Sequence, residues 1–273
     1  METNAPAALF WGHFKPTGLA RFLLGLVSAG VSRGPVRKII QRIWTRHCGL
    51  GPVDIDYHGL KLRLIPDRNI TDQKLLFRSG LRDAKDIKPM KEFAHANSVF
   101  LDIGANIGYY SLTAAKMGYG RLLAIEPNPI LIERLTFNIG ANAHQSRMSL
   151  APVAISDSPG EMLLEADGDM GSGHVVKVTA ESKGIPVKVE RLADVIAREN
   201  LGRVTAFKID VEGHEDKALL PYLRSLSDAD LPKLGIIEYV HSDEWSDDLI
   251  SYMLKRGYTQ ILRNRSNVIL RRA

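Results

Sequence analysis

The chain has 273 residues, of which 45% are hydrophobic, and this is enough apolar material for one well-formed core with a small appendage. Its single cysteine, Cys48, excludes an internal disulfide and a cysteine-rich metal site, and is typical of a reducing compartment. The net charge of +5 is concentrated in residues 1–50, which hold seven Lys or Arg residues and one Glu (+6), so the remaining chain carries −1 and nucleic acid is disfavoured as a partner.

Residues 1–50 are predicted to form a basic helical extension. Apolar residues recur at roughly helical spacing in two series, residues 19–27 and 39–44, and basic residues are interleaved with them. We expect two amphipathic helices, with the break at Gly34-Pro35.

The apolar run over residues 18–31 is too short to cross a bilayer. It also lacks the cationic start and the small-residue cleavage site of a signal peptide. Two uses of the extension stay open, namely peripheral attachment to an anionic membrane surface and packing against the catalytic body. We therefore expect a cytoplasmic protein that the extension could hold at the inner face of a membrane.

Residues 51–273 are predicted to form the catalytic domain, which begins with a β-hairpin. Residues 53–65 alternate between apolar and polar side chains on both sides of His58-Gly59, as hairpin strands do. A polar stretch over residues 72–86 then leads into a helix that ends near His95.

A strand, a glycine-rich turn and a helix over residues 98–118 carry the first chemical motif. The strand reaches Asp102, and the turn contains Gly104, Asn106 and Gly108. This arrangement brings backbone N–H groups and a positive helix end close to a polar ligand. Asp102 would repel a dinucleotide pyrophosphate, whereas it would attract a ligand that carries an ammonium and a sulfonium group.

A second acid strengthens this interpretation. Residues 121–126 are predicted to form a strand that ends in Glu126, a position suited to binding two ribose hydroxyls. The two acids together predict a site for S-adenosylmethionine (SAM). The glycine turn alone would also fit a tight turn in any α/β protein, and the second acid favours the SAM site.

Strands and helices alternate from residue 98 onward, which predicts an α/β fold with a doubly wound sheet. The expected helices cover residues 130–142, 192–200 and 247–256, and the expected strands cover 148–155, 204–209 and 234–239. Residues 258–262 and 267–270 are expected to close the sheet as antiparallel strands. A further hairpin, residues 161–164 with 175–178, surrounds a glycine-rich loop at 168–173 that is either a lid over the acceptor or an idle hairpin tip.

A second motif lies in residues 208–215, at the end of a predicted strand. It carries the candidate catalytic residues Asp210, Glu212 and His214, and Glu238 ends the neighbouring strand. Because parallel strands present their carboxyl ends to the ligand crevice, we expect all four side chains there. Methyl transfer to a hydroxyl needs an aligned acceptor oxygen and a base for its proton. The structural alternatives are that Asp210 caps the following helix and that His214 lies on the surface.

The two motifs, with Glu126-Pro127 and Asn138, resemble those of the FkbM-type methyltransferases over about residues 53–240. The resemblance implies a class I SAM-methyltransferase fold, which is Rossmann-like with a seven-stranded, mostly parallel sheet and an antiparallel last strand. It implies a set of SAM ligands, which are Asp102, Gly104, Asn106, Gly108, Glu126 and Pro127, with Asp210 at the methionine end or the acceptor side. Arg82-Asp83 stands where members often have Tyr-Glu.

The sequence therefore predicts a SAM-dependent O-methyltransferase that acts on a hydroxyl of a glycan or a glycan-like secondary metabolite. The resemblance implies a small molecule or glycan as the acceptor. A nucleic-acid amino-methyltransferase is not expected, because its Asn- or Asp-Pro-Pro-aromatic motif is missing. The alternatives are a nicotinamide-dependent oxidoreductase, which Asp102 disfavours, and a SAM-binding protein without catalysis. Converging carboxylates could also hold a divalent metal such as Mg²⁺, but they are equally common as positioning acids, so no metal ligand is assigned.

Overall fold

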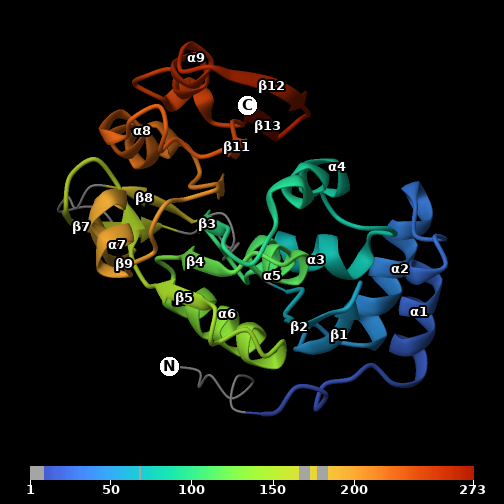
Figure 1. Ribbon diagram of the computed structural model, residues 1–273. Helices are drawn as coiled ribbons and strands as arrows, with labels where there is room; N and C mark the ends of the chain where they lie inside the picture. The colour runs from blue at the N-terminus through green and yellow to red at the C-terminus, as the bar shows by residue number, and fades with distance from the viewer. Residues whose placement is uncertain (1–8, 68, 166–172, 177–183) are drawn as a thin grey trace.

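The computed structural model describes residues 9–67, 69–165, 173–176 and 184–273, which build a central seven-stranded sheet (Figure 1). Its strand order is β12-β13-β11-β10-β3-β4-β5, in which β13 pairs antiparallel with both β12 and β11 and the other pairs are parallel. The strands are β3 (Val99–Ile103), β4 (Arg121–Ile125), β5 (Met148–Ala151), β10 (Ala206–Ile209), β11 (Leu234–Glu238), β12 (Tyr258–Arg263) and β13 (Asn267–Arg272). This topology confirms the predicted class I methyltransferase fold with its antiparallel last strand.

The sheet separates two apolar cores, because successive side chains of a strand point to opposite faces. Phe100 and Leu122 belong to one core, and their neighbours Leu101 and Leu123 belong to the other. The first core is completed by α5 (Tyr109–Met117) and α6 (Pro129–Ala141), and the second by α7 (Leu192–Arg198), α8 (Glu215–Ser225) and α9 (Leu249–Lys255). Asp102 and Lys208 are paired in register on β3 and β10, and both are buried.

The N-terminal extension packs on the first core and forms the two predicted helices, α1 (Gly18–Ser28) and α2 (Gly34–His47). Its buried apolar side chains are Leu23, Val27, Ile40 and Trp44. The Trp44 ring meets the Phe77 ring edge-on, with centroids 5.6 Å apart. The break lies at residues 29–33, and Pro35 falls in the first turn of α2, where no N–H partner is needed. No helix within the described ranges is long and apolar enough to span a membrane.

The predicted early hairpin is confirmed, since β1 (Val53–Tyr57) pairs antiparallel with β2 (Leu60–Leu64). The following polar stretch is more helical than the sequence predicts. It contains α3 (Ile70–Phe77) and α4 (Ala84–Ile87), and the 3-10 helix η1 (Lys88–Phe93) replaces the end of the predicted helix. The sequence pattern does not predict α3, because its polar residues look like those of a loop. In the structure Asn69 caps the helix and Asp72 is buried in an ion pair with Arg134.

The predicted strand over residues 148–155 is divided in the structure. After β5 the chain passes Pro152, which has no N–H for a ladder, and enters a second sheet with the order β6-β9-β7-β8. This sheet contains β6 (Ala154–Ile155), β7 (Gly160–Glu165), β8 (His174–Val176) and β9 (Ile185–Glu190). The pairing of β7 with β8 confirms the second predicted hairpin, whereas β9 is not among the predicted strands. Residues 168–172 of the proposed lid lie outside the described residues.

Candidate active site

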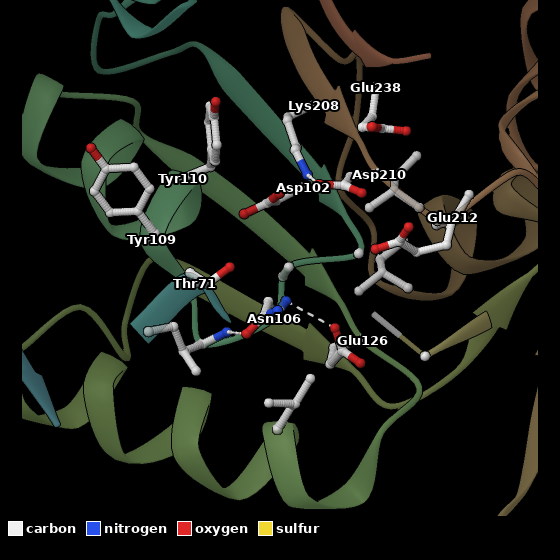
Figure 2. Close-up of a pocket in the computed structure, with 18 of the residues that line it drawn as sticks. Thr71, Asp102, Asn106, Tyr109, Tyr110, Glu126, Lys208, Asp210, Glu212 and Glu238 are labelled. Carbon is white, nitrogen blue, oxygen red and sulfur yellow. Dashed lines mark hydrogen bonds and ion pairs between the residues drawn. The ribbon is translucent and has the colours of Figure 1, made fainter. Parts of the chain in front are cut away.

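A cavity of about 620 Å³ lies at the carboxyl ends of β3, β4, β10 and β11, where the sequence predicts the ligand crevice. Thr71 and Lys74 of α3, Arg82 before α4 and Asn267 of β13 also line it. The volume is that of a small-molecule site. Figure 2 shows most of the acidic side chains that line the cavity, namely Asp102, Glu126, Asp210, Glu212 and Glu238, and Asp83 lines it as well.

Gly104 lies at the closest approach of two strand ends. A Cβ atom at this position would fall 1.8 Å from the backbone oxygen of Asp210, and the φ angle of +76° also favours glycine. The Asp210 N–H donates to the carbonyl of Ile103 over 3.0 Å, so both motifs are bound through their backbones. Gly104 therefore joins the two motifs as well as lining the cavity.

The rest of the glycine turn is held by side chains. Asn106 has a φ angle of +52°, and its Oδ1 accepts hydrogen bonds from the Ile107 N–H (2.8 Å) and from Asn69 Nδ2 (2.9 Å). Gly108 precedes α5 with a φ angle of +89°, and a Cβ there would lie 2.4 Å from Leu135 Cδ1. Contacts within the protein therefore hold the turn in its shape.

Asp102 is almost completely buried at the end of β3 (1% exposed). Its Oδ2 accepts hydrogen bonds from the N–H (2.9 Å) and the hydroxyl (2.5 Å) of Ser111 in the first turn of α5. Its Oδ1 has no hydrogen-bond partner among the described residues. Burial raises the pKa of Asp102, and nearby Lys208 opposes this effect. Asp102 thus holds α5 with one oxygen and leaves the other for a further donor.

Glu126 lies at the end of β4, beside the glycine turn, and Pro127 next to it also lines the cavity. Its Oε2 accepts from the Asn106 N–H (2.8 Å), as Figure 2 shows, and its Oε1 accepts from the Asn128 N–H (2.9 Å). Burial raises the pKa of Glu126 to about 7, against the effect of these two N–H groups. Each oxygen keeps a second lone pair, so the carboxylate is oriented and can still bind a diol.

Lys208 is a buried cation at the floor of the cavity. Its Nζ donates to Asp210 Oδ2 over 2.6 Å and lies 5.3 Å from the centre of the Tyr110 ring. Burial alone would lower the pKa of Lys208, but Asp210 and Asp102 raise it above its ordinary value. Figure 2 shows the three charged groups converging between β3 and β10. A cation here offsets the two carboxylates and fixes the position of Asp210.

Glu212 and Glu238 lie beyond Asp210 and have the most perturbed acidity on that side of the cavity. Burial, followed by the charge of Asp210, raises the pKa of Glu212 to about 7. Burial, followed by Asp210, Glu215 and Glu212, raises the pKa of Glu238 to about 8. Glu212 also has a φ angle of +54°, an uncommon backbone conformation for this residue type. Carboxyl groups with such pKa values can accept a proton near neutral pH.

His214 does not line the cavity. Its Nε2 is 2.8 Å from the Ser156 hydroxyl, and it occupies the residue before α8. Burial lowers the pKa of His214. Glu215, also buried, accepts from the N–H groups of Val211 (2.8 Å) and Gly213 (3.4 Å) and so supports the loop that carries Asp210 and Glu212.

Several residues that line the cavity receive no role from the sequence, among them Lys208, Tyr109, Tyr110 and Lys74. A signal for Lys208 is present, since it is a charged residue inside an otherwise apolar strand, and such residues are rarely buried without a partner. Within the described ranges, no group of three or more His, Cys, Asp or Glu side chains is arranged to hold a metal ion.

Comparison with known proteins finds a family and two curated relatives. The model of the methyltransferase FkbM domain matches residues 102–259. The 31-O-demethyl-FK506 methyltransferase FkbM of Streptomyces tacrolimicus is 25% identical over 226 residues, which cover 71% of this chain and 84% of that protein. Methyltransferase sdnD of Sordaria araneosa is 27% identical over 155 residues, which cover 45% of this chain and 60% of sdnD.

Solved structures are also among the matches to this chain. TYW2 of P. horikoshii in complex with MeSAdo has a TM-score of 0.44 and 17% identity, with 86% of this chain and 82% of that chain covered. Precorrin-6y C5,15-methyltransferase of Geobacter metallireducens has a TM-score of 0.43 and 13% identity, with 72% and 89% covered.

Proposed function

We propose that this chain, which belongs to the FkbM methyltransferase family, transfers a methyl group from SAM to a hydroxyl of a glycan or a glycan-like secondary metabolite. One observation carries the proposal. One cavity contains both the glycine turn with Glu126, an acid placed to bind ribose hydroxyls, and the carboxyl groups of Glu212 and Glu238. The pKa values of these two groups are raised to about 7 and about 8. The first set suits a nucleoside cofactor, and the second suits removal of a proton from a hydroxyl.

The residues of the glycine turn fit SAM. When bound, SAM supplies a methyl group on a positively charged sulfur. Glu126 would accept hydrogen bonds from the ribose hydroxyls, and the unpartnered Oδ1 of Asp102 would accept from the ammonium group. Pro127 and the turn residues Gly104, Asn106 and Gly108 would shape the surface beside the cofactor.

Glu238 is proposed to take the proton of the acceptor hydroxyl. It lines the cavity at the end of β11, and its pKa of about 8 is higher than the value of about 7 for Glu126 and Glu212. Glu212 lies beside it and helps to retain the proton, while Asp210, bound to Lys208, positions the acceptor. We assign His214 a structural part at the start of α8, and no metal ion is required for this scheme.

The extension is proposed to attach the enzyme peripherally to an anionic membrane surface. Its inner face is buried, but Leu19, Phe22, Val36 and Ile39 are 44%, 62%, 40% and 52% exposed on α1 and α2. The exposed basic residues of the same helices and their linker are Arg21, Arg33, Lys38, Arg42 and Arg46. Exposed apolar groups interleaved with cations are suited to anionic lipid, where each basic residue contributes about 1 kcal/mol. A cytoplasmic location follows from this proposal.

Transfer of labelled methyl groups tests the proposed function. We expect calorimetry to show binding of SAM and no binding of NAD, and labelled SAM to methylate a component of glycan or lipid extracts at a hydroxyl group. Asp102→Asn and Glu126→Ala should each weaken SAM binding by roughly tenfold or more, the effect of losing one charge-assisted hydrogen bond. Glu161→Ala, at an exposed acid outside the cavity, is the control. Binding of NAD would favour an oxidoreductase, and SAM binding without transfer would favour a non-catalytic protein.

A further inference from the structure

Besides Lys208, four cations line the cavity, and we call them the cationic wall: Lys74, Arg78, Arg82 and Arg265. Lys74 belongs to α3, Arg78 and Arg82 to the segment that follows it, and Arg265 to the turn between β12 and β13. In the part of the chain that the structure describes, only Arg82 among them forms an ion pair, with Asp83 (3.0 Å). Three side chains are therefore left without an acidic contact.

Arg82 is held in place by tyrosines that come from other elements. Its N–H donates to the Tyr57 hydroxyl (2.7 Å), and its carbonyl accepts from the Tyr109 hydroxyl (2.7 Å). Its partner Asp83 accepts from the Tyr110 hydroxyl (3.2 Å) and has a φ angle of +53°. The Arg82 side chain is 15% exposed, and its Nη1 is buried with no hydrogen-bond partner among the described residues. A fixed, unpartnered donor of this kind is typical of a binding site.

Lys74 lies in an environment that disfavours its charge. Burial, followed by the charges of Arg82 and Arg78, lowers its pKa. Like charges held together in a partly buried cavity repel one another, and an anion placed among them would remove this cost and add charge-assisted hydrogen bonds. Asp83 pairs with Arg82, and Asp83 and Asp210 partly offset the charge of Lys74, but positive charge remains in excess in the cluster. This arrangement favours an anionic ligand.

The place of the wall distinguishes the acceptor from the cofactor. Glu126 ends β4, whereas Arg265 precedes β13, which is separated from β4 by β11, β10 and β3. Asp86 of α4 bridges the two cationic segments, since it accepts from Asn264 Nδ2 (2.7 Å) and Asn267 Nδ2 (2.6 Å) beside Arg265. SAM has one carboxylate, which a single cation can balance, so four cations from two bridged segments exceed what the cofactor needs.

We infer that the acceptor is itself an anion, and that the cationic wall binds its carboxylate or phosphate group while the reacting hydroxyl faces Glu238. This inference rests on the proposed function of the same cavity and specifies its substrate class. It assigns acceptor recognition to Lys74, Arg78, Arg82 and Arg265, with the tyrosines and Asp86 as positioning residues.

Anion binding to the complex with S-adenosylhomocysteine tests the inference without a methyl-transfer assay. Inorganic pyrophosphate and D-glucuronate are titrated separately by calorimetry, with methyl glucoside as the neutral comparison. We expect at least one anion to bind the wild-type complex, and the tighter of the two identifies phosphate or carboxylate as the group. Lys74→Gln and Arg82→Gln should each weaken that binding by about tenfold. Lys85→Gln, at an exposed lysine of α4 outside the cavity, should leave anion binding unchanged. Methyl glucoside binding should be the same in the wild type and in every variant.

Two results would overturn the inference. One is that neither anion binds the wild-type complex, and the other is that the variants weaken S-adenosylhomocysteine instead, which would assign the wall to the cofactor carboxylate. Arg265→Gln changes an exposed residue and should therefore keep the wild-type melting temperature. It should still weaken anion binding, which separates loss of the binding group from loss of folding. If S-adenosylhomocysteine and SAM do not bind at all, the proposed function fails, and the same anion titrations on the chain alone still decide whether the wall binds anions.

Discussion

At the scale of single residues, Gly104 is a position where one added carbon atom would disturb both sequence motifs. A Cβ would overlap the Asp210 carbonyl oxygen at 1.8 Å, and that neighbour is backbone that cannot rotate away. Gly104→Ala should therefore separate the ends of β3 and β10 and disrupt both motifs. We expect a loss of several kcal/mol of unfolding free energy, measured by urea denaturation, together with loss of SAM binding.

Gly118 provides a matched control, because it also has a positive φ angle (+107°) but has nothing within 4 Å of its Cβ position. Gly118→Ala should cost only the backbone strain, about 1–2 kcal/mol. Equal destabilisation by the two substitutions would mean that the contact with Asp210 is unimportant.

Glu238 links acidity to both rate and stability. The pKa of Glu238 is raised from 4.5 to about 8, so the folded protein holds this proton more tightly than the unfolded chain does. Its contribution to stability is complete below pH 4.5 and is lost as the pH rises through about 8. As a base, Glu238 acts only when it is deprotonated, so turnover should rise with pH over the region around 8.

Glu238→Gln should abolish most of the turnover and stabilise the protein at high pH. At pH 9 it removes a buried charge near Asp210, and each kcal/mol gained should raise the melting temperature by about 2–4 °C. At pH 5, where the wild-type carboxyl group is protonated, the two melting temperatures should agree within about 1 °C. An unchanged rate in the variant, or a lower melting temperature at pH 9, would contradict the assignment.

At the scale of elements, α2 is anchored to the body through Trp44. The Trp44 side chain is 3% exposed and packs against Phe77 of α3, the helix that carries Lys74 of the cationic wall. Trp44→Ala should cost about 3–5 kcal/mol of unfolding free energy. Trp44→Phe should cost much less, because it keeps an aromatic ring and removes an indole N–H that has no partner among the described residues. Chemical denaturation measures both, and similar losses would argue against packing as the anchor.

At the scale of the whole molecule, charge and exposed apolar groups are concentrated in the extension. Residues 1–50 carry +6, and the rest of the chain carries −1. We expect the intact protein to float with anionic liposomes at low salt and to remain unbound at high salt, where screening weakens the attraction. Absence of flotation at low salt would refute the membrane proposal.

Substitution of the exposed face separates docking from packing. Phe22→Ser with Ile39→Ser changes two side chains that are 62% and 52% exposed, so the melting temperature should be preserved while flotation is lost. Ile130→Ser, at a side chain of α6 that is 37% exposed, is the control and should float like the wild type. A lower melting temperature in the double variant would indicate that this face is covered by protein.

The sequence was sufficient for whatever depends on short-range pattern. The hairpin around His58-Gly59, the strand that carries Asp102 and the helix that ends before Gly118 follow from local periodicity and turn chemistry. The family motifs also place acids at the ends of β4, β10 and β11, because topology determines where parallel strands end. The proposed roles of Asp102, Glu126, Asp210, Glu212 and Glu238 start from this local information.

Only the tertiary structure decided which distant groups meet. It brings Lys208 between Asp102 and Asp210, directs His214 to Ser156 and away from the cavity lining, and gathers the cationic wall from two segments joined through Asp86. These outcomes depend on burial and on contacts between residues far apart in the chain, and local periodicity contains neither. The helix α3 was concealed for the same reason, since Asp72 is polar in the sequence and becomes a core residue only when Arg134 pairs with it.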